Sequence, residues 1–331
     1  MPASTPSVSR SLCPTTRKYT ASVDPPRQRV IGFRALSKGI GRARRLVLNA
    51  AAKVNLILEV LGKRDDGYHE LVTVMQAVDL SDRITLEDAE VLELASSPGV
   101  PADGRNLALR AATALREAAG VTRGARITLD KRIPVAAGLG GGSADAAAVL
   151  LGLNRLWRLR WPVARLDEVA TGLGMDVPFF LRGGTALATG RGERLEPLRG
   201  RSLGLVLVNP RFAVSTAEMY ARVTPAMYTD GRHAKTLGGG LGGRSPARVA
   251  ASLYNGLQEV AVAAYPPIGR MRAALLAAGA LGALMSGSGP TVFGVARSFE
   301  HARQIRRRLT RGAWDCWAVR TLTGPAIRMA R

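Results

Sequence analysis

The segment KRIPVAAGLGGGSADAAAVL, residues 131–150, places four glycines at 138–142 directly before an alanine-rich stretch. Each glycine costs backbone entropy on folding, so this density indicates a backbone that must come close to another group. Backbone N–H groups at the start of a helix are unpaired and carry the positive end of its dipole. The pattern therefore predicts an anion cradle over 138–144 that leads into a helix. Ser143 could cap this helix, contact a phosphate or help to hold Mg²⁺, and a tight turn for strand–helix packing is the structural alternative.

The glycine loop differs from two common nucleotide-binding patterns. It lacks the GKS or GKT of a Walker loop, and GLGGGS lacks the spacing of the dinucleotide fingerprint. A second glycine-rich segment, DGRHAKTLGGGLGGRSP at 230–246, has no strand leading into it. We therefore expect this second segment to be a surface loop.

Composition limits the class of protein without choosing its function. The chain has 331 residues, of which 47% are hydrophobic, and this is enough for two domains with a real core. The formal net charge of +22 favours anionic partners, whether nucleic acid, acidic lipid or phosphorylated metabolites. Cys13 and Cys316 form no motif, which indicates a reducing compartment, and we expect a cytoplasmic protein. The apolar run at 273–285 is too short to span a bilayer, so no membrane partner is expected.

The order of the predicted elements indicates an α+β protein. Residues 1–42 carry a single acidic side chain and predict a disordered tail or a start codon assigned too early. After them, LVLNA, VNLILEV, HELVTVMQAVDL, DRITLEDA and ARITLDKRI read as strands, and NLALRAATALREAAG reads as a helix. The segments from LGLVLVNP to WDCWAVRTL, with a helix in STAEMYARV capped by Ser215 or Thr216, alternate as in a ferredoxin-like split β-α-β unit.

The glycine loop resembles the central motif of the GHMP kinase superfamily, Pro-x₃-Gly-Leu-Gly-x-x-Ser. The motif residues here are Pro134, Gly138, Leu139, Gly140 and Ser143. Three further segments are AAKVNLILEVLGKRDDGYHEL (51–71), LGMDVPFFLRGGTALATGRGE (173–193) and MSGSGPTVFGV (285–295). In this order and spacing they resemble the 4-diphosphocytidyl-2-C-methyl-D-erythritol kinase family of that superfamily. The GYHEL piece discriminates best, and the resemblance covers residues 43 to 320.

The resemblance implies a two-domain α+β fold. A ribosomal-protein-S5-domain-2-like domain would span 43–198 and carry the ATP-binding and catalytic residues. A ferredoxin-like domain would span 199–331, and the active site would lie between the two. The implied ATP-binding residues are those of the glycine loop: Pro134, Val135, Ala136, Ala137, Gly138, Leu139, Gly140, Gly141, Gly142, Ser143 and Ala144.

The resemblance also implies a reaction, the transfer of the γ-phosphoryl group of ATP to the 2-hydroxyl of 4-diphosphocytidyl-2-C-methyl-D-erythritol in the non-mevalonate pathway. A tertiary alcohol needs a base to take its proton. The family's catalytic aspartate falls on Asp176 in GMDVP, and its catalytic lysine falls on Lys53 in AAKVN. Lys53 would keep Asp176 ionised, orient it, and stabilise charge on the transferring group. Mg²⁺ would accompany ATP, held by phosphate oxygens, water and Ser143 without a dedicated metal site.

The cytidine diphosphate group of the implied substrate needs its own contacts. The resemblance assigns Tyr68 to stacking on cytosine and His69 to hydrogen bonding at its edge, while Tyr220 would cover the second face. Asn55 would bind the hydroxyls or the diphosphate, and Thr216, together with the GSGP turn around Ser288, would complete the site. The expected partner is this small molecule, with no specific nucleic acid, and the chain would be a monomer or weak homodimer.

Two departures and three alternatives qualify this interpretation. Ala51 stands where the family has proline, and NGLQ at 255–258 stands where it has N-D-L-E, so two carboxylates are missing. A kinase for homoserine, mevalonate or a sugar would lack the cytosine-facing GYH. A basic nucleic-acid-binding protein would explain the charge but leave the glycine loop unexplained. A non-catalytic relative would not need Lys53, Asp176 and Ser143.

Overall fold

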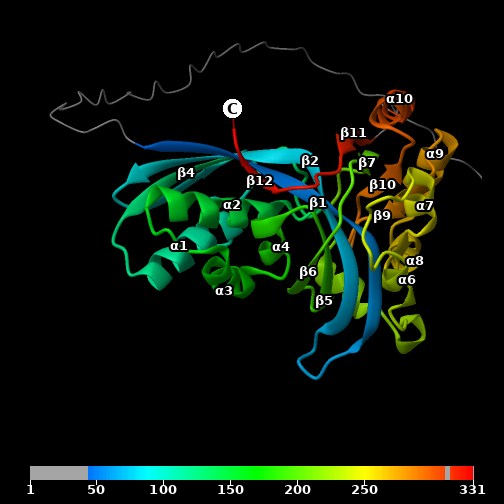
Figure 1. The fold of residues 1–331 in the computed structure, drawn as a ribbon, viewed down its shortest axis with the longest axis horizontal. Helices are drawn as coiled ribbons and strands as arrows, with labels where there is room; N and C mark the ends of the chain where they lie inside the picture. The colour runs from blue at the N-terminus through cyan, green and yellow to red at the C-terminus, as the bar shows by residue number, and fades with distance from the viewer. Residues whose placement is uncertain (1–43, 310–313, 331) are drawn as a thin grey trace, which may run out of the picture. The chain divides into compact units, whose positions relative to one another are not determined.

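The computed structural model describes residues 44–309 and 314–330. The predicted tail at 1–42 lies outside the described residues, and so does Cys13. The described residues form one compact unit, within which the elements fall into two sheets with separate sets of helices (Figure 1).

The first sheet has eight strands and carries the amino-terminal half of the fold. Its main path is β12-β1-β2-β4-β3, and β5, β6 and β8 join from the side. The bounds are β1 Arg45–Lys63, β2 His69–Ala89, β3 Leu92–Ser96, β4 Gly124–Asp130, β5 Thr185–Gly190, β6 Arg194–Leu198, β8 Tyr254–Asn255 and β12 Ile327–Met329.

The first two strands are longer than the sequence predicted. LVLNA and VNLILEV belong to the single strand β1, and HELVTVMQAVDL and DRITLEDA belong to the single strand β2. The two pair antiparallel along their length, with register shifts at Ala51/Ala52, Asn55/Ile57 and Val60/Gly62. Such irregularities bend a strand without ending it. The prediction of four separate strands was wrong, because these irregularities let each long strand continue through its bend.

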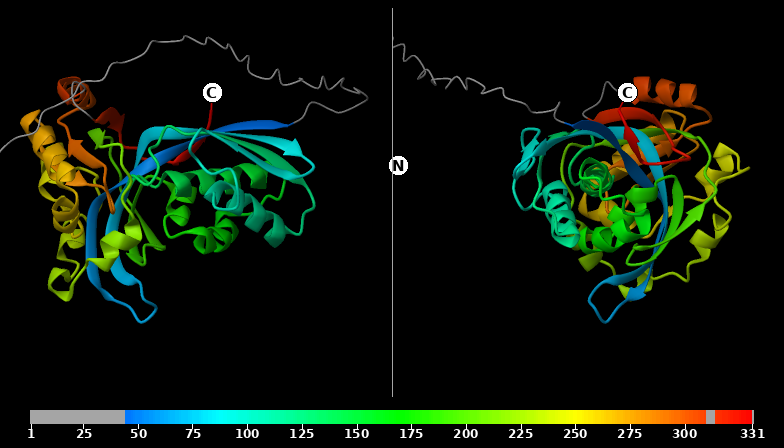
Figure 2. Two further views of the ribbon diagram at one scale, coloured as in Figure 1. Left: turned by 180° about the vertical axis from the view of Figure 1, so that it is seen from behind. Right: turned by 60° about the vertical axis from the view of Figure 1, so that its left-hand side comes forward.

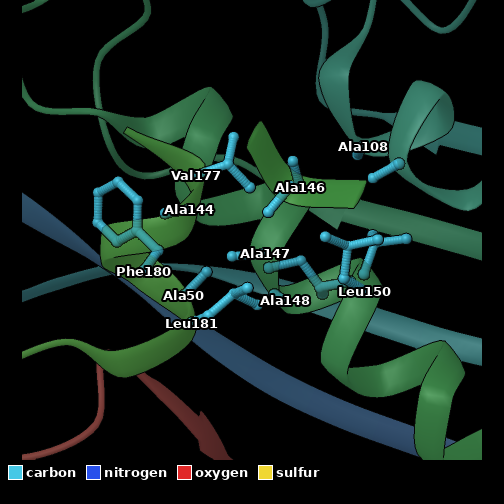
Figure 3. Packing of buried hydrophobic residues seen from close by; sticks show 14 of the residues in the cluster. Ala50, Ala108, Ala144, Ala146, Ala147, Ala148, Leu150, Val177, Phe180 and Leu181 are labelled. Carbon is cyan, nitrogen blue, oxygen red and sulfur yellow. The ribbon is translucent and has the colours of Figure 1, made fainter. Parts of the chain in front are cut away.

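Four helices cover one face of this sheet (Figures 1 and 2). They are α1 Leu107–Ala119, α2 Gly141–Leu156, α3 Val163–Leu173 and α4 Val177–Arg182. Helix α2 contacts β1, β2, α1 and α4 and is buried on nearly all sides. Figure 3 shows why alanine fills it: the short side chains of Ala144 and Ala146–148 let Phe180, Val177 and Leu181 of α4 and Ala50 of β1 approach closely.

The second sheet confirms the ferredoxin-like prediction. It has the order β11-β7-β10-β9 and is antiparallel throughout. Its strands are β7 Gly204–Asn209, β9 Gly282–Met285, β10 Val292–Val295 and β11 Asp315–Arg320. Helices α8 Gln258–Ala264, α9 Pro266–Ala277 and α10 Phe299–Leu309 complete this half, and α9 and α10 pack on the sheet.

The segment at 230–246 is not the surface loop that its glycines suggested. It contains α6 Arg232–Thr236 and leads into α7 Pro246–Ala251. Ala234, Leu237 and Leu241 are buried in one hydrophobic cluster with side chains of both sheets. The glycines allow the chain to turn tightly, and the apolar side chains between them anchor it to the core.

The two halves share core and strands. One cluster includes Val54 of β1 together with Leu205 and Phe293 of the second sheet. β8, which lies between β7 and β9 in sequence, and β12, which follows β11, pair with β1 of the first sheet. Two further short helical pieces, α5 Thr216–Ala221 and a 3₁₀ turn at Pro225–Met227, lie between β7 and α6. None of the helices within the described ranges is long and apolar enough to cross a membrane.

Candidate active site

Lys53 and Asp176 lie together, as the sequence predicted. Lys53 is on the bent part of β1, and its side chain is only 6% exposed. Its Nζ is 3.3 Å from Oδ2 of Asp176 and donates a hydrogen bond of 2.6 Å to Oδ1 of Asn55. Desolvation strengthens the attraction between opposite charges, so the pair is held more firmly than an exposed ion pair.

Asn55 and Thr73 fix the position of the lysine ammonium group. Asn55 accepts from Lys53 through its oxygen and donates through Nδ2 to Oγ1 of Thr73, at 2.8 Å. Thr73 in turn donates to the backbone oxygen of Ile57. Asn55 and Thr73 are both buried. The amide of Asn55, predicted to bind substrate, is therefore already engaged on both sides, by Lys53 and by Thr73.

Asp176 lies in the turn before α4, and its carboxylate does not cap that helix. It stands at the N-cap position of α4 with φ −85° and ψ −14°, and its carboxylate makes no cap hydrogen bond. Pro178 enters the first turn of α4, and Phe179 and Phe180 anchor that helix in the core. The Asp176 side chain is one-third exposed, so one of its oxygens can meet a substrate while the other faces Lys53.

The glycine loop reaches this pair through its backbone. Gly138 and Gly140 have φ of +73° and +71°, a region that favours glycine. A Cβ at Gly140 would lie 2.7 Å from the ring of Phe180 and 3.1 Å from Cγ of Lys53. The oxygen of Leu139 accepts from the backbone N–H of Lys53 at 2.9 Å. These close approaches explain why the loop needs a bare backbone beside the lysine.

The start of α2 differs in one detail from the prediction. The N-cap is Gly140, and Ser143 is the third residue of the helix, so of the three roles considered for Ser143 the cap was wrong. The helix therefore begins three residues earlier than it would with Ser143 as the cap, at a Gly140 in the left-handed conformation. Helix geometry leaves the amides of Gly141, Gly142 and Ser143 without an intrahelical acceptor. Within the described residues they donate to no other segment either.

The rest of the predicted ATP-binding stretch surrounds these amides. Ala136 has a positive φ of 51°, so the backbone at 136, 138 and 140 alternates into the left-handed region. Such alternation turns successive N–H groups toward one concave side, which suits an anion. Val135 is 60% exposed, whereas Ala137 and Leu139 are buried and hold the loop to the core.

The turn at 286–289 closes the other side of the loop. Ser286 donates through Oγ to the oxygen of Gly138 at 2.8 Å and accepts from the backbone N–H of Asn55 at 3.3 Å. A Cβ at Gly287 would lie 3.4 Å from Nζ of Lys53. Oγ of Ser288 is 2.9 Å from Oγ1 of Thr216, which brings the two predicted residues together.

The NGLQ segment at 255–258, which differs from the family pattern, holds the 286–289 turn through hydrogen bonds. Asn255 donates through Nδ2 to the oxygens of Met285 and Gly287, both at 2.8 Å. Gln258 accepts from the N–H of Met285 at 3.1 Å, a role that needs an acceptor and not a charge. A hollow of about 410 Å³ lies at these same residues and is lined by neither Lys53 nor Asp176.

An aromatic group stands near Asp176. The rings of His69 and Tyr220 stack with centroids 5.4 Å apart, and Tyr228 meets His69 edge-on at 6.4 Å. Burial lowers the pKa of His69, and the charge of Lys63 lowers it further, so both favour the neutral ring. Burial raises the pKa of Tyr220, and the charge of Asp176 adds to this effect.

Tyr68 lies apart from that stack. It is 54% exposed, and the guanidinium of Arg191 stands 5.1 Å from the centre of its ring. Its backbone N–H donates to Asp66 in the turn that joins β1 and β2. The tyrosine is therefore available to a ligand, whereas His69 and Tyr220 already contact each other.

Known proteins match the chain over almost all of its described length. Residues 106–184 match the family described as GHMP kinases N terminal domain, and residues 233–315 match GHMP kinases C terminal. A 4-diphosphocytidyl-2-C-methyl-D-erythritol kinase of Pelotomaculum thermopropionicum is 50% identical over 276 residues, which are 82% of this chain and 96% of that protein. The chain belongs to this kinase family. The kinase of the same name from Geobacter metallireducens is 46% identical over 282 residues, which cover 84% of this chain and 99% of the relative.

Solved structures agree with this membership. A crystal structure of 4-(cytidine 5'-diphospho)-2C-methyl-D-erythritol kinase matches with a TM-score of 0.72 and 38% identity over 83% of this chain and 99% of that one. A homoserine kinase from Cytophaga hutchinsonii matches with a TM-score of 0.69 at 20% identity, over 89% of this chain and 100% of that one, and shows the fold alone. Membership therefore makes the chain an ATP-dependent small-molecule kinase with the predicted two-part GHMP fold.

Sequence reasoning missed several residues that build this kinase site. Thr73 and Arg191 carry no motif signal, because only the fold brings them to Asn55 and Tyr68. Lys131, Asp82 and Asp145 form a buried ion cluster beside the glycine loop. An aspartate inside the apolar run SADAAAVLL was the one available sign of it. Throughout the described part of the chain, no group of three or more His, Cys, Asp or Glu side chains could hold a metal ion.

Proposed function

We propose that this kinase transfers the γ-phosphoryl group of ATP to the 2-hydroxyl of 4-diphosphocytidyl-2-C-methyl-D-erythritol, with Asp176 as general base and Lys53 as its partner. The observation that carries this proposal is the 3.3 Å contact of the Lys53 ammonium with Asp176 directly beside the glycine loop. The names and high identity of the relatives supply the substrate class.

The glycine loop fits a triphosphate. Three free amides at the start of a 16-residue helix, next to left-handed backbone at Gly138 and Gly140, offer donors and a positive dipole to phosphate oxygens. Mg²⁺, when bound with ATP, neutralises charge on the phosphates. Among the described residues Ser143 is a possible ligand and no carboxylate cage occurs, so most of the ion's ligands would be phosphate oxygens and water.

The transfer itself then needs a proton acceptor. The free oxygen of Asp176 takes the proton of the 2-hydroxyl as the alcohol oxygen bonds to the γ-phosphorus and the bond to the β–γ bridging oxygen breaks, which releases ADP. Lys53, held by Asn55 and Thr73, orients the carboxylate and stabilises negative charge on the transferring group.

The aromatic group provides the cytidine end of the site. Tyr220 stacks on His69, and the charge of Asp176 adds to the rise in the pKa of Tyr220, which supports one substrate that spans the aromatic group and Asp176. Tyr68 with Arg191 can close over the base or its diphosphate from the hairpin turn. Thr216 and Ser288 supply paired hydroxyls between these groups and the glycine loop.

Incubation with MgATP and the cytidylylated alcohol, followed by phosphorus NMR, tests the proposal. We expect a new phosphomonoester on the tertiary carbon and no turnover of homoserine or mevalonate. Asp176→Asn should lower kcat by about 100-fold to 10,000-fold, the usual contribution of a general base, with the fold intact by circular dichroism. Near wild-type kcat in a folded Asp176→Asn protein would reject the proposed base, and turnover of another alcohol instead would reject the substrate.

A further inference from the structure

A buried ion cluster joins the two ends of the glycine loop. Lys131 follows β4 immediately, Asp82 lies on β2, and Asp145 lies in the second turn of α2. Nζ of Lys131 donates to Oδ2 of Asp82 and, at 2.7 Å, to Oδ2 of Asp145. The side chains of Lys131, Asp82 and Asp145 are only 8%, 0% and 3% exposed.

Asp82 also binds the backbone that enters the loop. Its Oδ1 accepts from the N–H of Arg132 at 2.6 Å and of Ile133 at 2.8 Å. The residues that enter the loop are therefore bound to Asp82 of β2 in two ways, through the backbone N–H groups of Arg132 and Ile133 and through the side chain of Lys131. Asp145 ties the exit, because it belongs to the helix that the loop begins.

The cluster touches the phosphate-binding backbone itself. A Cβ at Gly141, the first residue of α2, would lie 3.1 Å from Nζ of Lys131 and 3.0 Å from Cγ2 of Ile133. Gly141 thus packs directly against the ammonium group, and its free amide and that of Gly142 belong to this same stretch of backbone. A shift of Lys131 cannot occur without a shift of these amides, since protein interiors are packed without spare space.

Stability alone does not account for the cluster. Replacing a buried ion pair by apolar side chains of similar volume is often neutral or stabilising, because burial of charge is costly. In this cluster two carboxyl groups share one ammonium group, and Oδ1 of Asp145 has no hydrogen-bond partner in the described structure. Burial raises the pKa of Asp145 to about 7, although the charge of Lys131 opposes this rise. What the ions do provide is one defined geometry, because hydrogen-bonded charges in a dry interior hold each other firmly.

We propose that Lys131, Asp82 and Asp145 are positioning residues that set the phosphate-binding amides of the glycine loop. The inference rests on the proposed function, because it assigns these amides to a nucleotide. It predicts that loss of the tie between Lys131 and Asp145 weakens nucleotide binding without a matching loss of fold or of acceptor binding.

The test uses the double variant Lys131→Met/Asp145→Leu, which replaces the tie by apolar side chains and leaves Asp82 with its two backbone donors. We expect calorimetry to give a dissociation constant for MgADP raised about tenfold or more, since misplacement by 1 Å can cost on the order of 100-fold at a positioned site. The KM for MgATP should rise with it, while the KM for the cytidylylated alcohol changes less than about twofold. The unfolding midpoint should fall, because Asp82 stays buried without its ammonium partner, so binding is measured well below that midpoint. The single variant Asp145→Asn keeps an acceptor for Lys131 and should bind MgADP nearly as tightly as the wild type.

Glu59→Gln is the matched control, because Glu59 is also a buried carboxylate with one unpartnered oxygen but binds the N–H of Ala234 in α6. It should leave MgADP binding unchanged. If the double variant does not fold, Asp145→Leu alone cuts the tie and leaves Lys131 balanced by Asp82. MgADP binding equal to wild type in either folded variant would overturn this inference alone. A wild-type protein that binds no MgADP would overturn both this inference and the proposed function.

Discussion

Gly138→Ala should damage the active site through the backbone alone. Gly138 has φ of +73°, and a Cβ there would lie 2.1 Å from the oxygen of Ser286 and 2.9 Å from that of Gly289. Ordinary contact begins near 3.4 Å, so the loop and the 286–289 turn must separate by about 1 Å. The methyl group therefore acts as a wedge between two segments that flank Lys53.

The magnitude follows from the strain and the lost contact. An L-residue in the left-handed region costs about 1 to 2 kcal/mol, and loss of the hydrogen bond from Ser286 to the oxygen of Gly138 costs about 1 kcal/mol. We expect the free energy of unfolding to fall by about 2 to 3 kcal/mol. A displacement of 1 Å at the reacting groups should lower kcat by about 100-fold.

Urea denaturation measures the first quantity, and a coupled ADP-release assay measures the second. Gly172→Ala is the control, because Gly172 lies in α3 with no atom within 4 Å of its added Cβ. The control should gain about 0.5 to 1 kcal/mol of stability, as glycine disfavours helices, and should keep wild-type kinetics. If Gly138→Ala retained both kcat and stability, the close packing of loop and turn would not exist in solution.

Three further changes examine other parts of the site. Asn255→Ala leaves the buried oxygens of Met285 and Gly287 without their donor, so urea denaturation should show a loss of about 1 to 3 kcal/mol together with a lower kcat; unchanged values would mean that the turn holds itself. The KM for the cytidylylated alcohol should rise as the pH falls below 6.5, because burial lowers the pKa of His69 and only the neutral ring keeps an acceptor for the base. Since this pKa lies below that of an exposed histidine, protonation on the acid side also disfavours the folded state, and a pH-independent KM would exclude His69 from substrate binding. Phe180→Ala removes a fully buried ring beside Gly140 and should cost about 3 to 5 kcal/mol in thermal or urea unfolding, whereas a loss below about 1 kcal/mol would contradict its place in the core.

Motif residues were predictable because their chemistry is local. The glycine loop, Lys53 and Asp176 each stand in a recognisable segment, and the fold brings them together as the resemblance implied. Residues that act by supporting them were not predictable in the same way. Thr73 and Asn255 are ordinary polar residues in sequence, and their importance arises only from the buried partners they meet.

Local sequence patterns led to wrong predictions of secondary structure in two places. The glycines at 238–243 suggested an exposed loop, yet Leu237 and Leu241 carry that segment into the core. LVLNA and VNLILEV suggested two strands, yet register shifts let one strand bend past the active site. In both cases local propensity was outweighed by the burial of a few apolar side chains.

The sequence by itself determined the family, the fold class and the chemical groups, because a glycine loop, an alanine-rich helix and two charged motif residues are properties of short segments. Only the tertiary structure decided that Asn55 is committed to Lys53, that Gly140 begins α2, and that Lys131 lies beneath Gly141. Each of these depends on distances between segments far apart in the chain. Such distances are set by packing and desolvation in the folded core, which no single segment encodes.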